Sequence, residues 1–273
     1  MFKQIKMKKI HQSLLFLCFS ISLGSFSQET ERNKEKIKEM ITDRPDATES
    51  PNTVYKGYFQ LETGSFYESF EENNFKSEVY GYNTTLLRYG ILNNLEFRLG
   101  LNFEEVRFTN NGRELENVTS GFSSLLAGMK VAIAEEKGLL PEIGLLGHLY
   151  LPFTASKDYR PETTGVDFRF SFAHTVSSKS SIAYNLGAQW LDDSPEAGYV
   201  YTFVYGYSIS DTVGLYVEVY GDLPEDNRAN HFWDAGFTYS IQNNIQLDAT
   251  IGKSFTEGQD ILVSTGISVR IPN

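Results

Sequence analysis

The segment that most constrains the fold is His231–Gly252, in which apolar and polar residues alternate along two consecutive runs. Trp233 and Phe237 belong to one row, and Asp234 belongs to the other. A period of two is typical of a β-strand, because successive side chains point to opposite faces. Residues 242–244 (Gln-Asn-Asn) separate the runs, and Asn tolerates the backbone of a tight turn. The segment therefore predicts a β-hairpin with one apolar face and one polar or charged face.

The first 27 residues have the pattern of a secretory signal peptide. Four lysines precede the apolar run Leu14–Leu23, and Ser25-Phe26-Ser27 places small residues at a cleavage site, so residues 1–27 are predicted to be removed. A lipoprotein signal ending at Cys18 is the alternative, but the residue before that cysteine, Leu17, is large. Removal of 1–27 takes away four lysines and no acid, which lowers the net charge from -11 to -15.

This composition excludes several classes of protein. Cys18 is the only cysteine, so the mature chain can have neither a disulfide nor a thiol nucleophile. The strong negative charge makes nucleic acid an unfavourable partner. A mean hydropathy of -0.30 and the lack of an apolar run of about 18 residues argue against a helical membrane protein. A membrane β-barrel remains allowed, because its strands are only half apolar.

The mature chain divides into a leader and a strand-rich region. Residues 28–54 are predicted to be a periplasmic N-terminal leader. Its first part is charge-rich, and its second part is interrupted by Pro45 and Pro51. Whether residues 41–54 form an ordered segment in or under a barrel mouth is left open. Residues 55–273 hold twelve runs with strand periodicity, at 55–68, 79–89, 95–107, 121–134, 142–152, 165–176, 181–191, 199–209, 213–221, 231–241, 245–254 and 260–270.

Short and long connections alternate between these runs. Tight turns are predicted at 90–94, 135–141, 177–180, 210–212 and 242–244, and longer polar loops, beginning with 69–78, lie between them. This alternation is typical of an all-β, transmembrane, antiparallel up-and-down barrel of twelve strands, with both termini in the periplasm. A soluble barrel is the alternative, but so many aromatic residues would be difficult to pack inside one closed barrel.

Three segments carry a resemblance to a known family: TDRPDATESPNTVYKGYFQLETG (42–64), TTLLRYGILNNLEFRLG (84–100) and YGDLPEDNRANHFWDAGFTYSIQNNIQLDATIG (220–252). Together they resemble a family of outer-membrane transporters named for the MetA pathway of phenol degradation. The resemblance runs in patches from about Thr42 to the C-terminus. It implies a Gram-negative outer-membrane β-barrel with a transport role, and it implies no particular substrate.

The charged row of the predicted strands supplies the candidate site residues. If the apolar row faces lipid, the opposite row faces a lumen and carries Glu62, Arg88, Glu96, Arg98, Glu104, Asp167, Arg169, Glu218, Asp234 and Asp248. Two interpretations remain open. These charges form a salt-bridge lattice across the strands, or they line a pore and set its selectivity. The acids outnumber the arginines, so we expect a mild preference for cations if a pore is open.

No enzyme, cofactor or metal site is predicted. His148, His174 and His231 are the histidines of the mature chain, and neither a Gly-x-Ser-x-Gly motif, a metal-binding His spacing nor a Gly-rich phosphate loop is present. We therefore expect a channel or transporter for passive passage of a small solute, with hydrophobic or aromatic compounds as candidates. Its expected partners are outer-membrane lipid and that solute. A closed structural or adhesin-like barrel and a lipid-modifying enzyme using His148 are the alternatives. Oligomeric state is left open.

Overall fold

The described part of the computed structural model comprises residues 40–191, 193–255 and 258–272. The predicted signal peptide 1–27 and leader residues 28–39 lie outside it. Strands account for most of these residues, and two 3-10 turns, η1 (Pro152–Thr154) and η2 (Lys157–Tyr159), lie in one loop. No helix among the described residues is long and apolar enough to cross a membrane.

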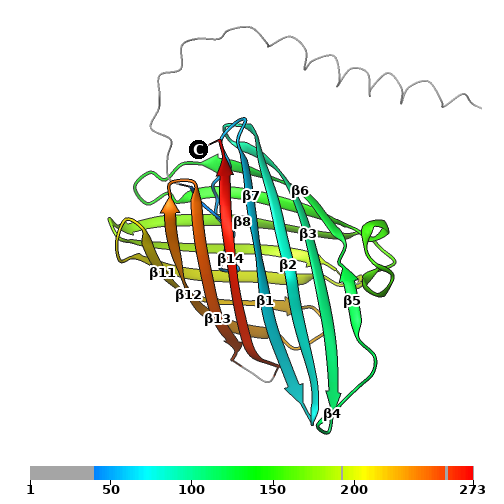
Figure 1. Cartoon of the computed structure of the whole chain (residues 1–273). Coiled ribbons are helices and arrows are strands. Elements are labelled where there is room, and N and C mark those ends of the chain that lie inside the picture. The colour runs from blue at the N-terminus through cyan, green and yellow to red at the C-terminus, as the bar shows by residue number, and fades with distance from the viewer. Residues whose placement is uncertain (1–39, 192, 256–257, 273) are drawn as a thin grey trace, which may run out of the picture. The chain divides into compact units, whose positions relative to one another are not determined.

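Twelve antiparallel strands form a closed barrel, which confirms the predicted fold class. Each strand pairs with its neighbours in chain order, and β1 pairs with β14 to close the ring. Figure 1 shows these two strands side by side. Two short strands in the loop after β3, β4 (Arg113–Glu114) and β5 (Thr119–Phe122), pair with β3. The barrel strands are β1 (Phe59–Glu72), β2 (Phe75–Leu92), β3 (Leu95–Asn110), β6 (Leu125–Ala134), β7 (Glu142–Leu151), β8 (Gly165–Ser177), β9 (Ser180–Trp190), β10 (Gly198–Ser208), β11 (Val213–Pro224), β12 (Asn230–Gln242), β13 (Ile245–Ser254) and β14 (Gln259–Ile271).

The hairpin β12–β13 shows which face of the sheet points outward. Its apolar row is exposed, with Phe237 at 46% and Ile251 at 54%, whereas Asp234 and Asp248 on the other row are each only 2% exposed. Exposed apolar side chains recur on the other strands, among them Leu87, Phe97, Met129, Leu149, Phe168, Phe170, Leu186, Phe203, Leu215, Val217 and Val263. An apolar outer surface around a polar interior is the arrangement expected of a barrel surrounded by lipid.

One predicted loop is wrong. Residues 69–78 are not a long connection, because β1 and β2 continue to a tight turn at Asn73 and Asn74, both of which have positive φ. We attribute the error to charged residues such as Glu71 and Lys76, because apolar and polar residues do not alternate in this part of the sequence. Strands that extend beyond the lipid need no apolar outer row, so this pattern fails there. The first strand also begins at Phe59 rather than at residue 55.

The two ends of the barrel differ as predicted, with that one exception. We call the end with turns at 93–94, 135–141, 178–179, 209–212 and 243–244 the turn end, and the opposite end the loop end. Two long connections at the loop end are tied together, because the Asp193 carboxylate accepts hydrogen bonds from the backbone N–H groups of Glu162 (2.9 Å) and Thr163 (2.7 Å). These hydrogen bonds hold the pKa of Asp193 below its ordinary value.

The outward apolar face predicts a contrast between two leucines. Leu186, near the middle of β9, faces outward at 54% exposure, and Leu139 lies 97% exposed in a turn. We expect Leu186→Arg to lower the free energy of unfolding from lipid vesicles by about 2–4 kcal/mol, because it places a charge in hydrocarbon. Leu139→Arg is the matched control and should change it little. Equal effects in urea titrations followed by tryptophan fluorescence would contradict a lipid-facing β9.

Candidate channel interior

Residues 40–54, which precede β1, lie inside the barrel, and we call them the luminal segment. Met40, Asp43, Thr48 and Val54 of this segment are all buried. Its side chains and backbone contact residues of β1, β2, β3, β6, β7, β9, β10, β11, β13 and β14. The segment therefore crosses the interior from one wall to the other.

The sequence explains why this segment is not a further strand. Cyclic side chains at Pro45 and Pro51 remove two backbone donors, so it cannot form a continuous ladder. The segment folds back on itself between Asp43 and Ser50. The Asp43 carboxylate accepts hydrogen bonds from the Ser50 backbone N–H (3.0 Å) and hydroxyl (2.9 Å). Four other backbone N–H groups, those of Asp43, Ala47, Glu49 and Val54, donate to side chains of the wall, such as Val54 N–H to Glu96 at 2.7 Å.

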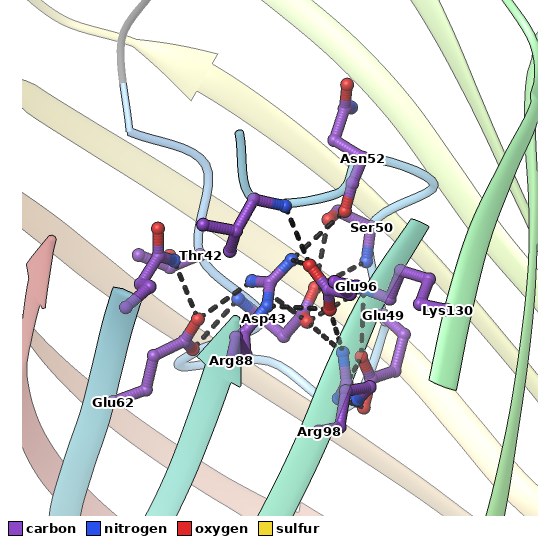
Figure 2. Close-up of polar contacts among 12 residues, drawn as sticks. Thr42, Asp43, Glu49, Ser50, Asn52, Glu62, Arg88, Glu96, Arg98 and Lys130 are labelled. Atoms are coloured by element: carbon purple, nitrogen blue, oxygen red, sulfur yellow. Dashed lines mark hydrogen bonds and ion pairs between the residues drawn. The ribbon is translucent and has the colours of Figure 1, made fainter. Parts of the chain in front are cut away.

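Seven charged side chains meet where the luminal segment touches β1, β2, β3 and β6, and we call them the charge cluster (Figure 2). Asp43 lies at its centre, 2.6 Å from Arg98, 2.7 Å from Lys130 and 3.0 Å from Arg88. Arg88 also contacts Glu62 and Glu96, and Arg98 also contacts Glu49 and Glu96. The full set is Asp43, Glu49, Glu62, Arg88, Glu96, Arg98 and Lys130.

The charge cluster holds four acids and three cations away from solvent. Removing charges from water costs several kcal/mol each unless they are paired and hydrogen-bonded. Arg88, Arg98 and Lys130 each contact at least two carboxylates, and Asp43 contacts all three cations. Because Asp43 comes from the luminal segment and the cations come from the wall, this pairing anchors the segment.

Further contacts anchor the segment to other parts of the wall. Arg44 pairs with Asp248 of β13 at 2.9 Å, and its guanidinium occupies the space above Gly64 and Gly266. Glu218 of β11 accepts hydrogen bonds from the Ala47 backbone N–H (2.7 Å) and from the Thr48 hydroxyl. On the adjacent strand, Asp234 lies directly opposite Glu218.

The residues predicted to line a lumen all carry side chains on the inner face, but they belong to different groups. Glu62, Arg88, Glu96 and Arg98 lie together in the charge cluster. The other predicted residues lie outside it. Asp248 pairs with Arg44, Glu218 lies opposite Asp234, Asp167 lies 3.5 Å from Arg169, and Glu104 lies apart toward the loop end.

Sequence reasoning missed three members of the cluster. Lys130 lies two residues after Gly128 on the same strand and therefore faces inward with it. The alternation in residues 121–134 could have predicted this inward orientation. Asp43 and Glu49 belong to a segment with no periodicity. For these two, the only signal was their place in TDRPDATESP (42–51), which is part of the family resemblance.

His148 is paired with Asp167, whose carboxylate lies 2.8 Å from the imidazole Nδ1. The other ring nitrogen, Nε2, is buried, and no described residue hydrogen-bonds to it. Nucleophilic catalysis needs a hydroxyl within reach of that nitrogen. Among the described residues, no Ser or Thr fills that role, so the geometry provides a positioned His–Asp pair and no catalytic triad.

The central place of Asp43 predicts a large effect of its neutralisation. We expect Asp43→Asn to lower the free energy of unfolding by roughly 3–5 kcal/mol, because Lys130 and two arginines would lose a buried counter-ion. Asp211→Asn, in an exposed turn, removes the same charge and should change stability by less than about 0.5 kcal/mol. Urea titration of both variants in lipid vesicles tests this, and wild-type stability of Asp43→Asn would show that the cluster does not hold the segment.

Comparison with known proteins places the chain in a family. No curated protein sequence matches it. Among solved structures it is similar to an outer membrane channel from Pseudomonas putida F1, with 14% identity and a TM-score of 0.62, covering 81% of this chain and 98% of that one. It is also similar to the KdgM porin, with 8% identity and a TM-score of 0.51, covering 77% and 98%. The family model described as "Putative MetA-pathway of phenol degradation" matches residues 42–271, and the chain therefore belongs to that family.

Proposed function

We propose that the protein is an outer-membrane channel for passive passage of a small solute, and that the luminal segment forms its narrowest part. The observation that supports this most directly is the path of residues 40–54 across the barrel interior. A structural barrel would be closed more simply by apolar side chains. Here the interior is instead crossed by one chain segment held by polar contacts.

The partners follow from the two faces of the barrel. Its outer apolar rows contact outer-membrane lipid, and residues 1–27 serve as the export signal. The loop end faces the outside and the turn end faces the periplasm. Hydrophobic or aromatic compounds are our candidate solutes, and they are in keeping with a family description that refers to phenol degradation and assigns no substrate. Passage is proposed to be passive, and the sequence carries no phosphate-binding loop for a nucleotide.

The ten predicted inward residues contribute to selectivity in two ways. Those in the charge cluster neutralise one another and fix the shape of the constriction. Away from it, acids such as Glu104 remain without a cation and favour positively charged solutes. This supports the mild cation preference, and a reversal potential showing anion preference would contradict it.

The two alternatives make different predictions. A closed structural or adhesin-like barrel would stay electrically silent with or without the luminal segment. A lipid-modifying enzyme would depend on His148, and His148→Ala would abolish hydrolysis of lipid substrates. Among the described residues, no hydroxyl hydrogen-bonds to His148 Nε2, so the channel is the better supported of these proposals.

Deletion of residues 42–52 tests the channel. We expect the single-channel conductance of the refolded barrel in a planar bilayer to rise several-fold, because the segment no longer crosses the interior. The cations of the charge cluster then become hydrated, and Glu62 and Glu96 remain as their partners. Heat-modifiable mobility on gels establishes that the barrel has formed.

Asp211→Asn is the matched control for conductance, since that residue lies in an exposed turn. It should leave both conductance and ion preference unchanged. Silence of the wild-type protein and of the deletion variant alike would contradict the channel. Equal conductance in both would place the constriction elsewhere.

A further inference from the structure

The inner face changes its chemistry toward the loop end. At the charge cluster its acids and cations pair with one another, whereas farther along β1 and β3 it carries Phe66, Glu68 and Glu104. All three side chains are partly exposed on the inner face. They are therefore accessible from the barrel interior rather than packed away like the charge cluster.

An aromatic ring lies on the same inner face as the two carboxylates. Gly81 of β2 is paired with Phe66 on one side and with Glu104 on the other. A Cβ atom at Gly81 would come within 2.1 Å of the Phe66 ring, so the glycine provides the space that this ring occupies. Glu68 lies two residues beyond Phe66 on β1 and points to the same face. Phe66 and Glu104 therefore lie in one row across β1, β2 and β3, and Glu68 lies beside that row along β1.

These acids lack the counter-ions that every acid of the charge cluster has. Among the described residues, no lysine, arginine or histidine lies within ion-pair distance of Glu68 or Glu104. Partial burial of two like charges is unfavourable unless a cation joins them.

A neighbouring amide supports the same conclusion independently. Gln259 of β14 is 4% exposed, and its Nε2 donates to the Glu68 carboxylate at 3.2 Å. Its Oε1 is buried and has no hydrogen-bond partner in the described part of the chain. A buried acceptor without a donor is costly. This oxygen, two carboxylates and the negative face of an aromatic ring all favour a positively charged donor.

We propose that Phe66, Glu68, Glu104 and Gln259 form a binding site for a small organic cation, of the aryl- or alkylammonium class, on the loop-end side of the luminal segment. The ammonium lies against the Phe66 ring and between the carboxylates, and the organic substituent contacts the ring. No group of three acidic, histidine or cysteine side chains among the described residues has the geometry of a metal site. The aromatic ring of Phe66 favours an organic cation over an inorganic one.

Calorimetric titration of the detergent-solubilised protein with benzyltrimethylammonium tests the site. We expect saturable binding, with benzoate giving none. The double variant Glu68→Gln/Glu104→Gln should weaken binding by roughly tenfold or more, since it removes both charge-assisted contacts. Phe66→Leu keeps an apolar side chain above Gly81 and should weaken it several-fold by removing the ring.

Glu114→Gln is the control, because that exposed carboxylate lies at the same end of the barrel outside the site. It should leave the affinity unchanged. Absence of saturable binding, or equal affinity of the double variant and wild type, would overturn the proposal. Calcium binding without benzyltrimethylammonium binding would also overturn it, in favour of an inorganic ion. Binding is measured without transport, so a silent channel would leave this site standing and would contradict only the proposed function.

Discussion

The structure depends on neutralising charge inside a cylinder whose outer face is apolar. Outward-facing leucines and aromatic residues leave the polar row of every strand pointing inward, where unpaired charge is costly. Asp43 meets the inward cations Arg88, Arg98 and Lys130 at a single point. The luminal segment is thus part of the electrostatic balance of the wall as well as an obstacle in its interior.

This balance differs between the two halves of the interior. In the charge cluster, near the turn end, every acid contacts at least one cation. Near the loop end, no described lysine, arginine or histidine forms an ion pair with Glu68 or Glu104. A solute entering from the loop end would therefore meet an acidic, aromatic region before it reached the salt-bridged constriction. Recognition and size restriction are separated along the barrel axis.

The strands were predictable because lipid outside and polar groups inside impose a period of two on the sequence. That rule worked for the hairpin around Asn243 and failed at Asn73, where the strands extend beyond the lipid and charged residues occupy both faces. The luminal segment was not predictable in the same way. It has no periodicity, and its partners are distant in sequence, as Arg44 and Asp248 show. The alternation along each strand predicted which charged residues face inward. It could not predict which of them meet in the charge cluster, because that depends on where the luminal segment lies.

The position of Arg44 has a consequence for how the barrel is completed. The first and last strands meet at one seam, and backbone pairing alone distinguishes poorly between registers that differ by two residues. Arg44 needs Gly64 of β1, Gly266 of β14 and Asp248 of β13 at one level. A slip of two residues would place Ser264 or Ser268 where the glycine must be. The luminal segment can therefore dock only when β1 and β14 pair in the native register. In this way the segment before the first strand stabilises the correct pairing of the last strand.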